Sequence, residues 1–93
     1  MLNSVTLVAG MRREISTRLM HEGSRHLVIV RYAPDHPFDL EWVFNRADID
    51  NSDIVWARDM GEARNRELLN YYPNRSVWLL EADTNPVGLT AYP

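Results

Sequence analysis

Cysteine and lysine are both absent from the 93 residues of this chain. Without cysteine the chain has no disulfide framework, no thiolate zinc site and no cysteine nucleophile. Without lysine it has no Schiff-base chemistry and no serine–lysine dyad. All ten basic residues are arginine, the side chain suited to bidentate recognition of carboxylate and phosphate. A genome that prefers arginine codons accounts for the same composition, so both interpretations stay open.

Long apolar runs and a secretory signal are missing as well. The longest uninterrupted apolar runs have four residues, as in Leu27–Val30, whereas a membrane span needs about 20. Arg12 and Arg13 follow the apolar Val5–Val8 stretch, although a signal peptide carries its positive charge before the apolar region. We therefore expect no membrane span and no secretory signal here. The opening residues Met1–Ser4 and the closing residues Ala91–Pro93 do not look like strong caps of a complete enzyme, so we expect the segment to be part of a longer protein.

The charge balance argues against nucleic acid as a partner. The net charge is −3, and the basic clusters are only the pairs Arg12–Arg13 and Arg64 with Arg66, whereas a nucleic-acid face needs clustered positive charge. Apolar residues make up 45% and charged residues 25% of the chain, which is typical of a globular domain rather than a disordered tail. Residues 1–93 are predicted to form one small domain.

An amphipathic helix is predicted before Gly23, a residue that ends helices in the left-handed conformation. Ser4 or Thr6 is its expected N-cap. Short β-branched runs then predict three buried strands and a short edge strand. The apolar centres of these strands are unbroken, which indicates cover on both faces, as in a parallel sheet. The predicted strands are 26–32, 53–58 and 76–81, with 87–92 as the edge strand.

A second helix is predicted from Asp59 to about Tyr72, because Asp59 and Glu62 have the spacing of a capping box and Pro73 ends the run. The result is an α/β fold: a small, mostly parallel three-stranded sheet with a fourth edge strand, flanked by two helices in Rossmann-like layering. Strand 26–32 is expected at its centre. For residues 40–46 a helix and an extended segment both stay open. Trp42 within them either joins the core or stacks on a sugar ring.

Ligands in open parallel sheets bind beyond the carboxyl ends of the strands, and a helix N-terminus there offers backbone N–H groups to an anion. Arginines and a histidine at that edge would suit a phosphate or a carboxylate. The candidate ligand-binding residues are Arg31, Tyr32, His36, Arg58, Asp59, Met60 and Gly61. Structural roles are the alternative: a cap for Asp59, ion pairs for the arginines and a solvated loop position for His36.

Motifs for metal or cofactor chemistry are missing from the sequence. Asp48, Asp50 and Asp53 lack the spacing and the glycine of a calcium loop. His21 and His26 lack the spacing of a zinc pair. None of the four glycines lies in a G-x-G arrangement of a phosphate loop. We therefore expect no metal, no cofactor and no catalytic residue in this segment.

One succession of residues is distinctive. It comprises His26–Tyr32, His36, Glu41–Asn45, Ala47–Asp50, Ile54–Gly61, Asn65, Leu68–Leu69, Tyr72–Pro73, Arg75 and Val77–Trp78. This succession, spanning about residues 12–83, resembles the soluble C-terminal segment of large bacterial multi-spanning membrane proteins. Those proteins are glycosyltransferase-like and are related to the protein O-mannosyltransferases and lipid-linked-sugar transferases.

The resemblance implies a role outside the chemistry itself. In such transferases an acidic residue of the membrane part acts on a polyprenyl-phosphate sugar, so no catalytic residue carries over to this segment. The implied function is a non-catalytic accessory domain that positions substrate or a partner, with the membrane-embedded remainder of the parent protein as its partner. The implied location is the extracytoplasmic face of the bacterial inner membrane, with the cytoplasm as the alternative.

Two other functions stay open beside the accessory domain. The first is a small anion-binding module at the carboxyl edge of the sheet, which would take a phosphorylated or sugar ligand. The second is a free-standing enzyme acting on a phosphorylated substrate, for which the sequence offers no nucleophile.

Overall fold

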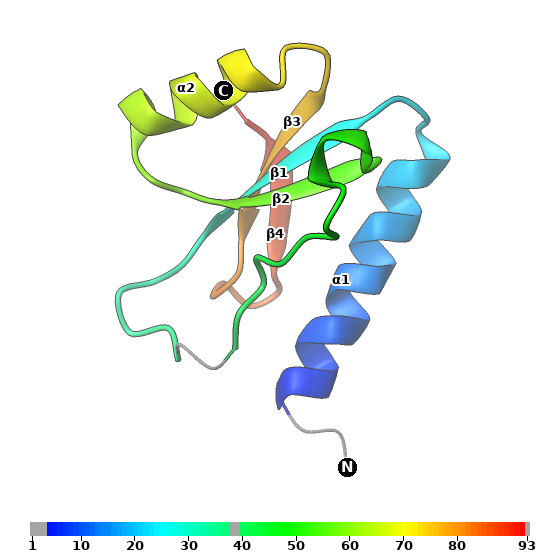
Figure 1. The fold of residues 1–93 in the computed structure, drawn as a ribbon. Coiled ribbons are helices and arrows are strands. Elements are labelled where there is room, and N and C mark those ends of the chain that lie inside the picture. The colour runs from blue at the N-terminus through cyan, green and yellow to red at the C-terminus, as the bar shows by residue number, and fades with distance from the viewer. Residues whose placement is uncertain (1–3, 38–39, 93) are drawn as a thin grey trace.

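The computed structural model describes residues 4–37 and 40–92 (Figure 1). All the predicted helices and strands are present, and a single 3-10 turn is added between the first two strands. The helices are α1 (Ser4–His21), η1 (Ile49–Asn51, the 3-10 turn) and α2 (Glu62–Tyr71). The strands are β1 (His26–Arg31), β2 (Ile54–Arg58), β3 (Ser76–Glu81) and β4 (Gly88–Ala91).

The four strands form one mixed sheet in the order β2-β1-β3-β4. β1 runs parallel to both of its neighbours, so Val28 lies between Trp56 of β2 and Trp78 of β3. β4 is antiparallel to β3, because the short connection between them leaves no room for a crossover. The predicted central place of the first strand is therefore confirmed, and the edge strand makes the sheet mixed rather than wholly parallel.

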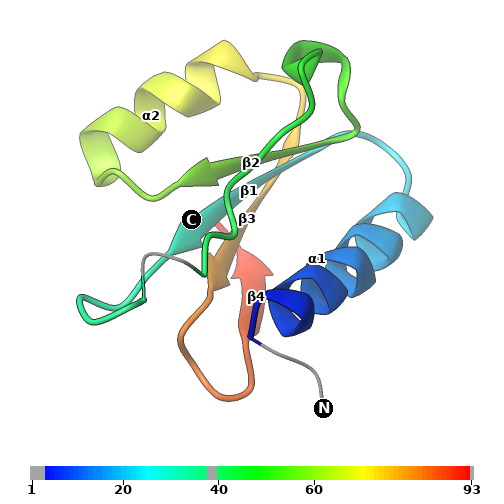
Figure 2. The ribbon, with the colours of Figure 1, turned by 60° about the horizontal axis from the view of Figure 1, so that its bottom comes forward.

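The two helices cover opposite faces of the sheet, which gives three layers (Figures 1 and 2). Successive side chains of a strand point to opposite faces, so β1 supplies Val28 and Val30 to the α1 side and Leu27 and Ile29 to the α2 side. The buried core on the α1 side is completed by Val8, Ile15, Leu19, Trp42, Trp56 and Leu80. On the α2 side it is completed by Val55, with Leu68, Leu69 and Tyr72 packed against it.

The connection from β1 to β2 contains no helix between residues 40 and 46. It lies on the α1 face, where the Trp42 side chain is only 1% exposed and belongs to the core. The core role of Trp42 is therefore confirmed, and a surface role in stacking on a sugar is excluded by its burial. The Arg12 guanidinium lies over the rings of Phe44 and Trp56, at 3.6 and 4.2 Å from their centroids, and so holds this connection against α1.

The caps of both helices differ in part from the prediction. Gly23 lies just beyond α1 with φ +71°, which confirms it as the stop, whereas Thr6 lies inside α1 and is not its cap. Gly61 is the N-cap of α2, and no side chain caps this helix. The predicted capping box of Asp59 and Glu62 is therefore wrong, because Asp59 lies two residues before the cap and its carboxylate is bound by other partners.

Candidate functional site

The three parallel strands bring their last residues to one edge of the sheet, as predicted. Arg31 ends β1, Arg58 ends β2 and Glu81 ends β3. Around them the structure divides the candidate residues into two clusters. One contains Arg31, Asp59, Met60 and Gly61, and the other contains Tyr32, His36 and Arg58.

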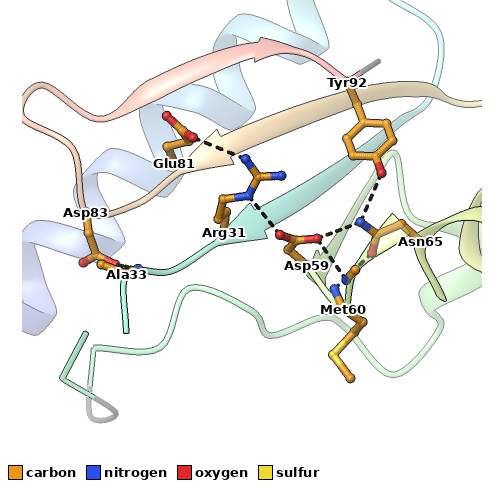
Figure 3. A network of polar contacts seen from close by, with 9 residues as sticks. Arg31, Ala33, Asp59, Met60, Asn65, Glu81, Asp83 and Tyr92 are labelled. Carbon is orange, nitrogen blue, oxygen red and sulfur yellow. Dashed lines mark hydrogen bonds and ion pairs between the residues drawn. The ribbon is translucent and has the colours of Figure 1, made fainter. Parts of the chain in front are cut away.

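In the first cluster, Arg31 lies between two carboxylates (Figure 3). Its Nε donates to Asp59 Oδ2 at 2.9 Å, and its Nη1 lies 3.5 Å from Glu81 Oε1. The hydrogen bond to Asp59 raises the pKa of Arg31 above its ordinary value. The pKa of Asp59 is lowered, first by the hydrogen bond from Asn65 and then by that from Arg31. Arg31 is thus paired within the chain and faces an excess of negative charge.

Asn65 of α2 organises the start of its own helix. It is only 2% exposed, and its Oδ1 accepts the Met60 N–H at 3.0 Å. Its Nδ2 donates to Asp59 Oδ1 at 2.7 Å and to the Tyr92 hydroxyl at 3.1 Å (Figure 3). The Gly61 N–H donates to Asp59 Oδ1 at 3.3 Å. The N–H groups of Met60 and Gly61, which the sequence suggested would meet an anion, therefore have partners inside the chain.

A depression of about 480 Å³ lies at this cluster. Its charged lining consists of one guanidinium, on Arg31, and two carboxylates, on Asp59 and Glu62. A site attracts a ligand of the opposite charge and repels a ligand of the same charge, and the net charge of this lining is negative. The electrostatics of this depression therefore suit a neutral hydroxylated ligand better than a phosphate or a carboxylate.

In the second cluster, the Glu41 carboxylate is the common acceptor of several hydrogen bonds. Its carboxylate accepts from the Tyr32 hydroxyl and from Arg58, and it also accepts the Val43 N–H at 3.0 Å. The Tyr32 oxygen in turn accepts the Trp42 N–H at 2.8 Å. Burial and the hydrogen bond to Glu41 raise the pKa of Tyr32 to about 12. Burial opposes ionisation of Glu41, but the bonds from Tyr32 and Val43 and the charge of Arg58 outweigh it, so its pKa is lowered.

His36 fastens the same connection to the end of β3. Its ring stacks on Tyr32 with centroids 4.1 Å apart, and its side chain is 8% exposed, so it is not a solvated loop residue. Nδ1 bonds the Asp83 carboxylate and Nε2 bonds the Leu40 carbonyl at 2.8 Å. Both partners are acceptors, so only the doubly protonated ring satisfies both. Burial, the largest single influence, lowers the pKa of His36. The hydrogen bonds to Asp83 and the Leu40 carbonyl and the negative charges of Asp83 and Glu41 together outweigh it, so the net shift of the pKa is upward.

At the opposite, amino edge of the sheet an arginine binds backbone carbonyls instead of carboxylates. Arg75 donates to the backbone carbonyls of Ser52 at 2.6 Å, Asp50 at 3.0 Å and His26 at 3.2 Å. Burial lowers the pKa of Arg75, and the nearby positive charge of Arg25 adds to this. Within the described residues Arg75 forms no ion pair with a carboxylate.

The buried His26 belongs to the same amino edge. Its Nε2 bonds the Gly23 carbonyl at 2.8 Å, and its Nδ1 accepts the indole N–H of Trp78 at 3.0 Å. One ring nitrogen donates and the other accepts, which is the pattern of a neutral imidazole. Its role is to join the end of α1 to the sheet.

Sequence reasoning missed Glu41, Asn65 and Tyr92 as members of the carboxyl edge. Asn65 carries a signal that could have revealed it, because it lies three and four residues before Leu68 and Leu69, on the apolar side of its helix. A polar residue in such a stripe is buried only when its hydrogen bonds are satisfied. Glu41 and Tyr92 lie in segments without a regular period and carry no comparable signal.

The aspartates before β2 take structural roles. Asp48 accepts from the Asn51 side chain at 3.0 Å, and Asp50 accepts from the hydroxyls of Tyr71 and Tyr72 at 2.9 and 3.1 Å. In residues 4–37 and 40–92 no group of three or more histidine, aspartate and glutamate side chains is arranged to hold a metal ion. Over the same residues, no helix has the length and apolar character to cross a membrane.

Comparison with family models, with curated proteins and with solved structures finds no significant match to this chain.

Proposed function

We propose that this chain is a non-catalytic accessory domain of a membrane glycosyltransferase-like protein, and that it positions a substrate or a partner. The proposed partner is the membrane-embedded remainder of that protein, and the proposed location is the extracytoplasmic face of the inner membrane. Both follow from the resemblance of residues 12–83 to the soluble segment of such proteins.

One structural observation supports this role over anion binding. At the carboxyl edge, the cationic side chains among the candidate residues each face a carboxylate of the same chain: Arg31 with Asp59, Arg58 with Glu41 and His36 with Asp83. A phosphate would have to displace one of these carboxylates and leave it without its counter-charge. Paired in this way, the groups hold residues 32–37, residues 40–46 and the start of α2 in place, which suits a domain that presents a fixed surface.

An amide chemical-shift titration of the isotopically labelled domain tests the proposal against its alternative. The probes are inorganic phosphate, a nucleotide sugar, a short-chain polyprenyl phosphate and a simple oligosaccharide. We expect no saturable shifts with inorganic phosphate. Saturable shifts confined to Arg31, Tyr32, Arg58 and Asp59–Gly61 would instead establish the anion-binding module. Arg31→Gln is the variant that should abolish such shifts, and Arg13→Gln, at an exposed position on α1, is its control.

The accessory role has its own test in the parent protein. Deletion of this segment should leave the membrane part folded and reduce its transfer activity, because the domain positions substrate or partner rather than reacting with it. Full activity after the deletion, with the membrane part present at its normal level, would contradict the proposal.

A further inference from the structure

The two outer strands of the sheet, β2 and β4, differ in whether their outward backbone groups have hydrogen-bond partners. At the β2 edge, the side-chain amide of Asn45 bonds both backbone groups of Trp56: Nδ2 donates to the carbonyl at 2.8 Å and Oδ1 accepts the N–H at 2.9 Å. A primary amide offers one donor and one acceptor side by side, as a peptide group does. Asn45 therefore occupies the place at which a further strand would pair with the centre of β2.

The β4 edge has no such closure among the described residues. β4 is last in the strand order, and the Tyr92 N–H donates to the Val77 carbonyl of β3 at 3.0 Å. Backbone groups of an antiparallel strand alternate between its two sides, so those of Leu89 and Ala91 point away from β3. β4 has the sequence Gly-Leu-Thr-Ala, without the charges or prolines that commonly protect an edge strand.

A groove of about 240 Å³ follows this open edge between β4 and α1. It is lined on the strand side by Pro86, Val87 and Leu89, and on the helix side by Met11, Glu14, Ile15 and Arg18. Leu7 lies one turn before Met11, on the same side of α1, and its side chain is 51% exposed. The edge is therefore flanked by apolar surface that carries one acidic and one basic side chain.

We propose that β4 pairs antiparallel with β4 of a second copy of this chain, so that one sheet continues across a two-fold axis. With Thr90 of the two copies opposite each other on the axis, Leu89 of each copy exchanges hydrogen bonds with Ala91 of the other. Leu89 and Ala91 lie on the α1 face, since their partners in β3 are Leu80 and Trp78. The groove of each copy then faces the groove of the other.

A second copy fits this edge because the edge is self-complementary. An isologous interface brings the same patch together in reversed direction, so the acidic Glu14 of one groove meets a surface that carries the basic Arg18 of the other. Threonine pairs directly opposite each other are favourable across antiparallel strands. A strand of four residues gives a small interface, so we expect association that is weak and depends on concentration.

Sedimentation velocity over a concentration series tests the proposal, and Ala91→Pro is the decisive variant. Proline removes the outward N–H of Ala91, a position at which edge strands tolerate it. By symmetry each dimer loses two hydrogen bonds, so the dissociation constant should rise about tenfold or more. Ala91→Val keeps the N–H and is the matched control, with a change of less than about threefold.

A second variant guards against misfolding of the first. Thr90→Lys puts two like charges opposite each other on the axis, while in the monomer this exposed side chain stays in water. It should weaken the dimer with an unchanged circular dichroism spectrum. A chain that stays monomeric up to about 1 mM, the weak end of specific binding, would overturn the proposal. A dimer that both variants leave intact would overturn it as well.

Discussion

The cationic and imidazole side chains at the carboxyl ends of the three parallel strands bind different partners from those at the amino ends. At the carboxyl edge, Arg31, Arg58 and His36 face carboxylates, whereas at the amino edge Arg75 and His26 bond backbone carbonyls. Carboxylates titrate and their ion pairs are screened by salt, whereas a backbone carbonyl does not titrate. The comparison therefore predicts that acid and salt loosen the carboxyl edge first and leave the hydrogen bonds of Arg75 in place.

The largest expected effect comes from breaking the amino edge. Arg75→Met keeps much of the apolar stem but removes the hydrogen bonds to the carbonyls of His26, Ser52 and Asp50. Unpaired carbonyls that are partly buried are costly, so we expect the free energy of unfolding to fall by about 2–4 kcal/mol. Urea denaturation at several salt concentrations measures this loss.

The control for that prediction is the neighbouring arginine. Arg25 is exposed and makes one long contact, 3.4 Å to the Asp50 carbonyl, so Arg25→Met should cost less than about 0.5 kcal/mol. Equal losses in the two variants would mean that Arg75 acts through its charge rather than through its carbonyl partners.

An intermediate effect is expected when the carboxyl edge is titrated at His36 and Asp83. The pKa of His36 is raised above its ordinary 6.5, so the stabilisation is fully present below about pH 6.5 and is lost as pH rises through the folded-state pKa. The pKa of Asp83 is lowered below its ordinary 3.8, so its contribution is lost as pH falls through that lowered value. The pair should stabilise the fold most between about pH 4 and 6.5.

Asp83→Asn isolates this pair. At pH 5.5 it should lower the free energy of unfolding by about 1–2 kcal/mol, since the carboxylate is partly exposed to solvent. It should also reduce the decline in stability above pH 6.5. Thermal unfolding across pH 4.5–8.5 gives both quantities, and His21→Gln, at an exposed position, corrects for a second histidine. An unchanged pH profile in Asp83→Asn would assign the pH dependence to another group.

The smallest effect is expected for an ion pair on α2 whose two side chains are largely exposed to water. Arg66 and Glu62 form an ion pair at 3.2 Å with side chains 68% and 85% exposed. Exposed pairs one helical turn apart contribute about 0.3–0.5 kcal/mol at most. Glu62→Gln should therefore change stability by no more than that, and the difference should vanish in about 1 M salt. A larger loss would show that this exposed ion pair contributes more to the free energy of unfolding than exposed helical pairs usually do.

Much of the fold could be predicted because local patterns decide it. The β-branched runs located the parallel strands, and the unbroken apolar centre of Leu27–Val30 indicated a strand covered on both faces. Two details escaped the prediction. The capping box depended on Asp59 having no other partner, whereas Arg31 and Asn65 bind it. The conformation of residues 40–46 depended on the burial of Trp42, which no local period reveals.

The sequence predicted at which edge of the sheet the candidate residues lie, but it did not predict which partners they bind. Parallel strands bring their carboxyl ends together, so the edge that holds Arg31 and Arg58 followed from the strand assignments. The partners did not follow, because Glu41 lies nine residues from Tyr32 and seventeen from Arg58 in the sequence. Such pairings depend on the path of the connection between the strands, which a periodic pattern does not describe.

The central place of β1 also bears on the order in which the chain assembles during synthesis. Both neighbours of β1 come later in the sequence, and β3 ends only at Glu81. As the chain leaves the ribosome, α1 and β1 therefore emerge with no strand to pair with. Contacts distant in sequence close slowly and leave apolar surface exposed in the meantime. A nascent chain should thus depend on chaperones until β3, which begins at Ser76, has left the ribosome.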